Sequence, residues 1–289
     1  SPSWHSGKSA DAAFLKNVSE ALAVWDDSRA YLGDAGFGLG RGGEINDDHT
    51  YYGWYIGDAN SYTIHGKNHS LLSGEELPAS QPQTFTECVG NYLTAGGDFD
   101  VAGKNWAWAL KWAGTSQGQH AADEHAAYVA KQSIEIVRRR RRFNPSLAGI
   151  MPFHSPFYYC GDDVQHFADI SSHPSPVLRQ QKTSFAEVLL SIEHWTPHGF
   201  EGAALPVQMH VVNDNDDGRA LGPTTLHWSW QVAGGATSVH GGQEAVPATP
   251  HYQTSVLSLN LSFPAIPSRL SAAAESAAPT AVKLVAKLM

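Results

Sequence analysis

The chain has 289 residues, which is enough for one large domain or for one domain and a smaller companion. Its formal net charge of −9 argues against a nucleic-acid partner, because no basic surface would dominate the electrostatic field. Two cysteines cannot supply a disulfide framework, and no apolar run approaches the length of about 18 residues that would predict a membrane-spanning helix.

The first third of the chain predicts one helix and three strands. Apolar residues recur near helical spacing over 11–25 and predict an amphipathic helix, and a short strand is expected at 29–32. The glycine-rich stretch 34–43 lacks the Gly-Lys-Ser/Thr ending of a phosphate loop and is interpreted as a flexible loop. A strand that runs into an aromatic loop is expected at 45–56, and the next strand at 83–87.

The middle of the chain predicts a long helix, a strand and a second helix. The long helix is expected at 120–142, with the arginines 138–142 as its solvated C-terminal end, where cations complement the helix dipole. A buried strand is expected at 147–153, and the stretch 175–190 changes from helix to strand near Val188.

From residue 206 the pattern changes to alternating strands. They are expected at 207–212, 225–232, 255–263 and 282–288, and the acidic stretch 213–218 reads as a turn. This period of two predicts a small β-sandwich, whereas the strands and helices of the first part alternate as parallel α/β units require.

Glu87 stands out among the candidate functional residues. The β-prone run 84–86 precedes it, and the small and polar residues after it are expected to break the strand. In a parallel α/β barrel this end of a strand is where catalytic groups lie. A glutamate with no catalytic role would give the same local pattern, so the interpretation of Glu87 depends on the motifs of the neighbouring strands. Cys88 reads as a small residue of the site wall.

Three segments resemble consecutive strands of family 2 glycoside hydrolases, the group of β-galactosidases, β-mannosidases and β-glucuronidases. Residues 48–55 (DHTYYGWY), 85–90 (FTECVG) and 148–153 (AGIMPF) resemble the sixth, seventh and eighth barrel strands. The resemblance implies an α/β fold: residues 1–187 as the C-terminal half of a (β/α)8 TIM barrel, and residues 188–289 as an immunoglobulin-like β-sandwich.

The resemblance also implies a retaining exo-β-glycosidase, similar to β-galactosidases, with Glu87 as its nucleophile. The acid/base glutamate of the family ends the fourth strand and would lie upstream of Ser1, outside this chain. Asp47 and Asp48 are candidate replacements, although strand alternation lets only one of them point inward. Sugar contacts, with packing as the alternative role, are expected at His49, Tyr51, Tyr52, Trp54, Phe153 and His154.

The implied partners are a carbohydrate substrate and another polypeptide segment that completes the barrel, with neither nucleic acid nor membrane. We expect no cofactor and no metal, because His120 and His125 lack ligand spacing and the turn at 213–218 lacks the distal glutamate of a calcium loop. Three glycosylation sequons, at Asn17, Asn68 and Asn260, are compatible with a secreted or periplasmic location.

Two other functions remain open at this level. A catalytically incompetent, glycosidase-like chain could serve as a subunit or carbohydrate-binding scaffold, which the missing acid/base glutamate favours. A related barrel enzyme, such as an endo-glycanase, is disfavoured by the appended sandwich.

Overall fold

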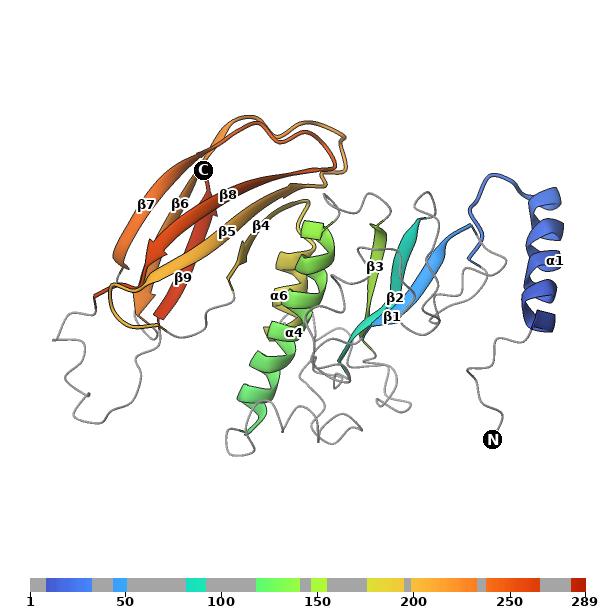
Figure 1. Ribbon diagram of the computed structural model, residues 1–289, viewed down its shortest axis with the longest axis horizontal. Helices are drawn as coiled ribbons and strands as arrows, with labels where there is room; N and C mark the ends of the chain where they lie inside the picture. The colour runs from blue at the N-terminus through green and yellow to red at the C-terminus, as the bar shows by residue number, and fades with distance from the viewer. Residues whose placement is uncertain are drawn as a thin grey trace, which may run out of the picture. The chain divides into compact units, whose positions relative to one another are not determined.

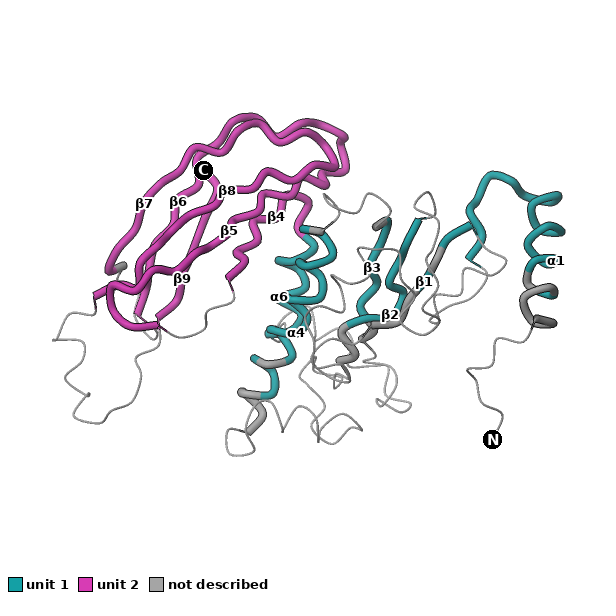
Figure 2. Tube along the Cα trace, in the orientation of Figure 1, with its two compact units in different colours: residues 1–185 teal, residues 186–289 magenta. Residues whose placement is uncertain are grey.

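The computed structural model describes residues 9–32, 44–50, 82–91, 118–140, 147–154, 176–194, 199–232, 238–265 and 282–289. The chain divides into two compact units, Ser1–Phe185 and Ala186–Met289 (Figure 2). Within the described part, strand residues outnumber helical ones and the sheets are open rather than closed into a barrel. The assignment of 1–187 to a barrel and of 188–289 to an immunoglobulin-like domain stays a prediction.

The first unit contains a parallel sheet with the strand order β1-β2-β3. Its described elements (Figure 1) are α1 (Ser9–Trp25), β1 (Asn46–Thr50), β2 (Gln83–Asn91), α4 (Gly118–Arg140), β3 (Leu147–His154) and α6 (Pro176–Ser184).

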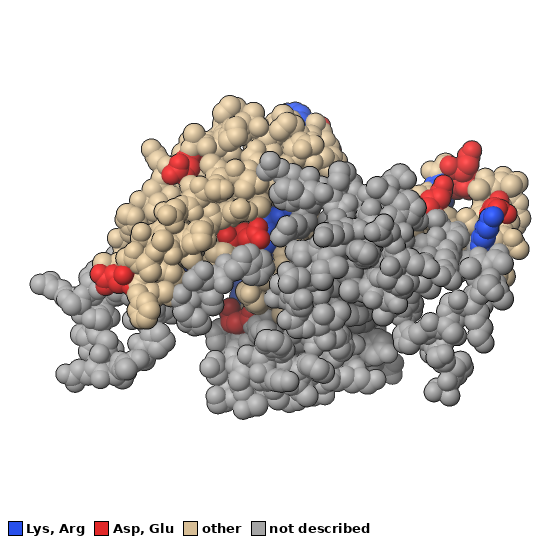
Figure 3. Space-filling model, viewed as in Figure 1, with Lys and Arg blue, Asp and Glu red and all other residues tan. Residues whose placement is uncertain are grey.

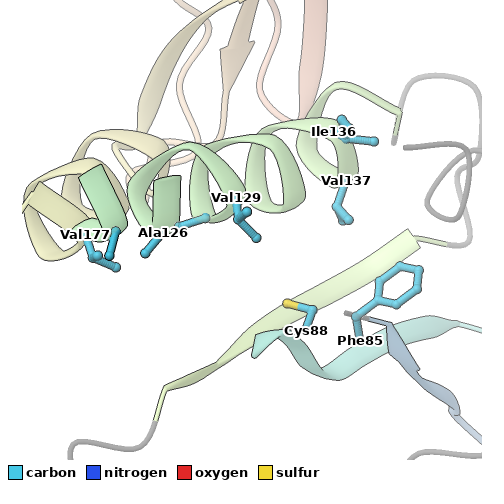
Figure 4. Packing of buried hydrophobic residues seen from close by; sticks show 9 residues of the cluster. Phe85, Cys88, Ala126, Val129, Ile136, Val137 and Val177 are labelled. Carbon is cyan, nitrogen blue, oxygen red and sulfur yellow. The ribbon is translucent and has the colours of Figure 1, made fainter. Parts of the chain in front are cut away.

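The core of this unit lies between α4 and the strand β2. Alanine and β-branched residues recur every three or four positions along α4, so the helix presents one flat apolar side. Phe85 and Cys88 point from β2 toward that side (Figure 4), where they are fully buried. Their partners in the cluster are Ala122, Ala126, Val129, Ala130, Ile136, Val137 and Val177.

Helix α1 confirms the helix expected at 11–25, but the strand expected at 29–32 is wrong. Residues 26–32 have no regular secondary structure. Asp26 forms an Asx-type turn directly after the helix, because its Oδ1 accepts hydrogen bonds from the backbone N–H of Ser28 at 2.9 Å and from the Ser28 hydroxyl. The chain therefore turns where its β-prone residues predicted an extended segment.

The expectation of a solvated arginine-rich helix end is also wrong where the side chains are described. Arg138 and Arg139 are buried. Arg139 Nη1 lies 3.8 Å from Glu135 Oε2, Arg138 donates to the carbonyl of Ser184, and the Ser184 hydroxyl donates to Glu135 at 3.1 Å. Helix α6 covers this end of α4: Arg138 binds across the helix pair and Arg139 pairs within α4, so neither cation faces water.

Strand β3 appears at the expected place, yet it is not buried. Ala148 and Met151 are exposed, whereas Ile150 packs against the core beneath α4. Ala148 and Ile150 are two residues apart and would share a face of a regular strand, so β3 does not alternate simply between core and surface; its register with β2 shifts at Ala148.

The second unit consists of two antiparallel sheets that share one hydrophobic core. One sheet has the order β4 (Val188–Glu193), β5 (Ala204–Asn213), β8 (Gln253–Ser262). The other has the order β7 (Ser238–Val246), β6 (Thr224–Val232), β9 (Val282–Leu288). Residues of both sheets form a single cluster, which makes the unit a β-sandwich.

The alternating pattern correctly predicted β5, β6, β8 and β9, and β4 begins at Val188, where the change from helix to strand was expected. The turn at 213–218 is confirmed. Asn213 closes this turn by donating from Nδ2 to the carbonyl of Arg219 at 2.9 Å, and Gly218 adopts a φ of 73°. Strand β7 was not predicted, because Gly241 and Gly242 interrupt its alternation.

Candidate functional site

Strand β2 contains one more residue than each of its neighbours. Against β1, Asp47 pairs with Thr84 but His49 pairs with Glu87, so three steps along β2 oppose two along β1. Against β3 the register shifts at three places, and one of them, where Phe85 pairs with Ile150 and Cys88 with Pro152, is the same mismatch. The two offsets overlap at residues 85–87, which locates a β-bulge immediately around Glu87.

The bulge decides which face of the sheet Glu87 occupies. Phe85 and Cys88 are three residues apart and would face opposite sides of a regular strand, yet both pack under α4. The extra residue between them absorbs the difference and carries Thr86 and Glu87 to the face opposite α4. Glu87 is half-buried there.

The carboxylate of Asp47 fills the gap that the bulge leaves between β1 and β2. Asp47 is 1% exposed, and its Oδ1 accepts hydrogen bonds from the backbone N–H of Thr86 at 2.8 Å and from the hydroxyl of Thr84 at 3.1 Å. Its Oδ2 accepts the hydroxyl of Thr86. With both oxygens engaged, Asp47 is unsuited to act as an acid/base group. The side chain of Asp48, the other candidate, lies outside the described residues.

Cys88 lies in the core rather than in the wall of a site. Burial, and secondarily the charge of Asp47, raise the pKa of its thiol well above the ordinary value. The thiol donates to the carbonyl of Met151 at 3.5 Å. A protonated, buried thiol is neither a nucleophile nor a metal ligand.

The sequence-predicted site residues fall into three groups. Glu87 is described in full. The backbones of His49, Phe153 and His154 are described: His49 is level with Glu87 in the register of β1, and His154 pairs with Asn91 at the end of β3. The remaining three, Tyr51, Tyr52 and Trp54, lie outside the described residues.

Sequence reasoning missed the pairing of Asp47 with the threonines. The available signal was the spacing of Thr84 and Thr86, which places two hydroxyls on one face of a strand, combined with an aspartate in the preceding strand. Strand β2 also continues to Asn91, beyond the break expected after Glu87.

An open hollow of about 460 Å³ lies at the C-terminal end of α1, and its lining includes none of the strand residues named above. Trp25, Tyr31 and Glu44 contribute to it. Hydrogen bonds from Ser28 lower the pKa of Asp26 at its edge. Charged side chains of the described residues are scattered over the face shown in Figure 3 and form no basic patch there.

Among the described residues, no three His, Cys, Asp or Glu side chains are grouped closely enough to hold a metal ion. No helix in the described ranges is long and apolar enough to cross a membrane.

No protein-family model matches the chain, and no curated protein matches its sequence. Among solved structures, a β-glucuronidase from Bacteroides uniformis is 13% identical, with a TM-score of 0.33 over 88% of this chain and 31% of that one. A red sea bream transglutaminase is 16% identical, with a TM-score of 0.22 over 35% and 14%.

An alkylpurine DNA glycosylase from Pseudomonas fluorescens, bound to DNA with an abasic-site analogue, is 10% identical, with a TM-score of 0.22 over 61% of this chain and 46% of that one. The chain therefore spans less than half of each of these proteins. A β-glucuronidase is among the neighbours, but likenesses this distant do not assign a family.

Proposed function

We propose that this chain carries the nucleophile of a retaining exo-β-glycosidase, similar to β-galactosidases, that hydrolyses terminal non-reducing sugars. The observation that carries the proposal is the position of Glu87. It occupies a bulge in the middle strand of a parallel sheet, on the face opposite the covering helix, level with His49. Bulges of this kind re-aim side chains beside active sites.

The arrangement of elements supports the fold that this function needs. Three parallel strands in chain order, with α4 between β2 and β3 in sequence and packed on one face, are what the last strands of a (β/α)8 barrel require. The orders β4-β5-β8 and β7-β6-β9 suit an immunoglobulin-like sandwich. An open parallel sheet calls for another polypeptide segment to complete the barrel.

The proposed reaction proceeds in two displacements at the anomeric carbon. The carboxylate of Glu87 attacks this carbon while the bond to the aglycone oxygen breaks, and the leaving oxygen takes a proton from the acid/base group. Water then attacks the same carbon, gives its proton to the acid/base group and releases Glu87. The two carboxyl groups of such enzymes lie about 5–5.5 Å apart.

The sugar itself would be held by groups on all three strands and their following loops. An aromatic platform suits the apolar face of a pyranose ring, and polar side chains suit its hydroxyls. We assign these contacts to His49, Tyr51, Tyr52, Trp54, Phe153 and His154.

One observation favours a second candidate function. Both oxygens of Asp47, one of the two candidate replacements, are engaged by three donors, and we therefore assign the acid/base group to a segment outside this chain. A chain that never meets such a group would be a catalytically incompetent subunit or a carbohydrate-binding scaffold.

The substitution Glu87→Gln tests the enzyme proposal in the complete native assembly. Glutamine keeps the shape of glutamate but cannot form the glycosyl-enzyme intermediate, so we expect kcat on aryl β-glycosides to fall by about a thousandfold or more, with ground-state binding of sugar retained. The exposed Glu124 of α4 supplies a matched control, since Glu124→Gln removes the same charge away from the site.

Chemical rescue sharpens this test. Glu87→Ala leaves room for azide, which can attack the anomeric carbon from the face opposite the leaving group and yield the α-glycosyl azide. Residual activity of Glu87→Gln within about tenfold of wild type would remove Glu87 from the nucleophile role and favour the scaffold.

A further inference from the structure

We propose that Asp47 is a positioning residue: it fixes the bulge in β2 and thereby sets the direction of Glu87. The inference rests on the proposed function for its catalytic consequence, whereas its structural half stands on hydrogen bonds of the described residues alone.

The bulge in β2 disrupts backbone hydrogen bonds between β1 and β2. An extra residue in one strand leaves backbone groups that the neighbouring strand cannot pair, and a buried unpaired N–H is costly. The backbone N–H of Thr86 lies within the mismatch between Asp47 and His49 on β1. It donates to Asp47 Oδ1 at 2.8 Å, so a side-chain oxygen takes the place of a backbone carbonyl.

The Asp47 carboxylate is held rigidly against β2. Thr84 and Thr86 donate their hydroxyls to the two different oxygens of Asp47, so the carboxylate is held at both ends. Hydrogen bonds to a charged acceptor are stronger than neutral ones, and the group is almost completely shielded from water. Asp47 therefore ties β1 to the two threonines that flank the buried Phe85.

The hydrogen bonds between Asp47 and Thr86 bear directly on the position of Glu87. Glu87 directly follows Thr86, and its face depends on where along β2 the extra residue is accommodated. A slip of one residue would exchange the two faces of the strand and bring Glu87 toward α4. Even a displacement of about 1 Å at a reacting group can cost about 100-fold in rate.

Two substitutions at Asp47 separate positioning from proton transfer. Asparagine keeps the Oδ1 acceptor, and its amide group can donate to the hydroxyl of Thr86, so Asp47→Asn should hold the bulge while Asp47→Ala should release it. On a substrate with a poor leaving group we expect kcat of Asp47→Asn to stay within about threefold of wild type. A proton-transferring Asp47 would instead make Asn as damaging as Ala.

The catalytic readout is covalent labelling of Glu87 with 2,4-dinitrophenyl 2-deoxy-2-fluoro-β-galactoside, located by peptide mass spectrometry in the complete native assembly. This probe needs the nucleophile but no acid catalyst, because its leaving group is good. We expect Asp47→Ala to slow labelling by about 100-fold and Asp47→Asn by about threefold or less. Asp123→Ala, which removes a buried aspartate from α4, serves as the control.

The structural readout is hydrogen exchange at the Thr86 amide, which does not depend on any activity. Exchange should accelerate in Asp47→Ala and stay slow in Asp47→Asn. Labelling of Asp47→Ala at the wild-type rate would overturn the positioning role and leave the nucleophile intact. A wild-type protein that is not labelled at Glu87 would remove the proposed function and this catalytic consequence together, while the exchange data would still report on the bulge.

Should Asp47→Ala fail to fold, Thr86→Val supplies the decisive comparison. Valine has the shape of threonine and keeps the backbone donor, so only the hydroxyl bond to Asp47 is lost. We expect labelling to slow by about tenfold. A folded Thr86→Val protein that is labelled as fast as wild type would overturn the proposal.

Discussion

Glu87 and Cys88 are adjacent in the chain, but they occupy opposite environments. Cys88 lies in the core under α4 together with Phe85, whereas the bulge carries Glu87 to the other face of the sheet. A single inserted residue thus separates a half-exposed carboxylate from a buried thiol. The environments of these two side chains are therefore set by how the backbone of β2 pairs with its neighbouring strands.

The reactivity of Cys88 tests its placement. Because burial raises the pKa of the thiol, it should stay protonated and resist iodoacetamide at pH 8 in the native protein, and it should react readily in urea. Peptide mass spectrometry, which separates Cys88 from Cys160, measures both states. Rapid native alkylation at Cys88 would place the thiol at the surface and contradict the bulge.

The same pKa shift has a consequence for stability with a definite sign. Its contribution to stability is complete below the ordinary thiol pKa of 9.0 and declines as the pH rises from there toward the higher folded value. Alkaline conditions should therefore favour unfolding, and a Cys88→Ala variant should lose this part of the pH dependence.

The sequence could predict the strand that contains Glu87 but not the bulge beside this residue. A β-prone run that ends in a glutamate is a local pattern, so it can be read from neighbouring residues. The bulge depends on a mismatch with both flanking strands, and the bond from Asp47 to Thr86 spans 39 positions of the chain. No window of a few residues contains that information.

Helices α1 and α4 show, at the scale of elements, that periodicity predicts a helix without predicting its burial. Both were expected, yet Phe14 and Trp25 of α1 are 66% and 84% exposed, whereas α4 buries even Arg139. The difference arises from α6, which lies against α4 and supplies partners for its charges. The sequence of α4 alone does not show that α6 packs against it.

Two ion pairs with the same i,i+4 spacing make this difference measurable. Glu135→Ala removes the carboxylate that pairs with the buried Arg139 and accepts the hydroxyl of Ser184, and we expect the free energy of unfolding to fall by about 3–5 kcal/mol. Glu20→Ala breaks the exposed pair with Lys16 and should cost about 0–0.5 kcal/mol. Urea unfolding measures both, and equal losses would contradict the burial of the α4–α6 contact.

Strand β7 was missed because Gly241 and Gly242 interrupt its alternation, and the structure gives a reason for both glycines. A Cβ at Gly241 would lie 2.6 Å from the backbone oxygen of Trp228. A Cβ at Gly242 would lie 2.7 Å from the ring of Trp228 on the paired strand β6, so the close approach requires glycine. Gly242→Ala should lower the free energy of unfolding by about 1–3 kcal/mol through overpacking.

Gly222 is the matched control, because a Cβ there would meet no atom within 4 Å. Gly222→Ala should leave stability unchanged or raise it slightly, by reducing the entropy of the unfolded chain. Thermal unfolding compares the two variants, and a Gly242→Ala protein as stable as Gly222→Ala would mean that β7 does not pass this close to Trp228.

At the scale of the whole molecule, the change of pattern near residue 206 predicted two kinds of structure, and the contacts separate the units at residue 185. The second unit can be understood by itself, because its two sheets bury each other's apolar faces. In the first unit, the apolar side chains of α1 lie exposed and the described parallel sheet has only three strands. We propose that further polypeptide packs around these described elements.

Hydrogen exchange on the 289-residue chain tests this requirement. Because small sheets with unprotected edges are marginally stable, we expect the outer strand β1 to exchange much faster than β5 and β6, which pair on both sides in the sandwich. Addition of the polypeptide segment that completes the proposed barrel should slow exchange in β1 and leave β5 and β6 unchanged. A chain that is monomeric by light scattering, unfolds in one cooperative step and protects β1 as strongly as β5 would show that the first unit is stable without a partner segment.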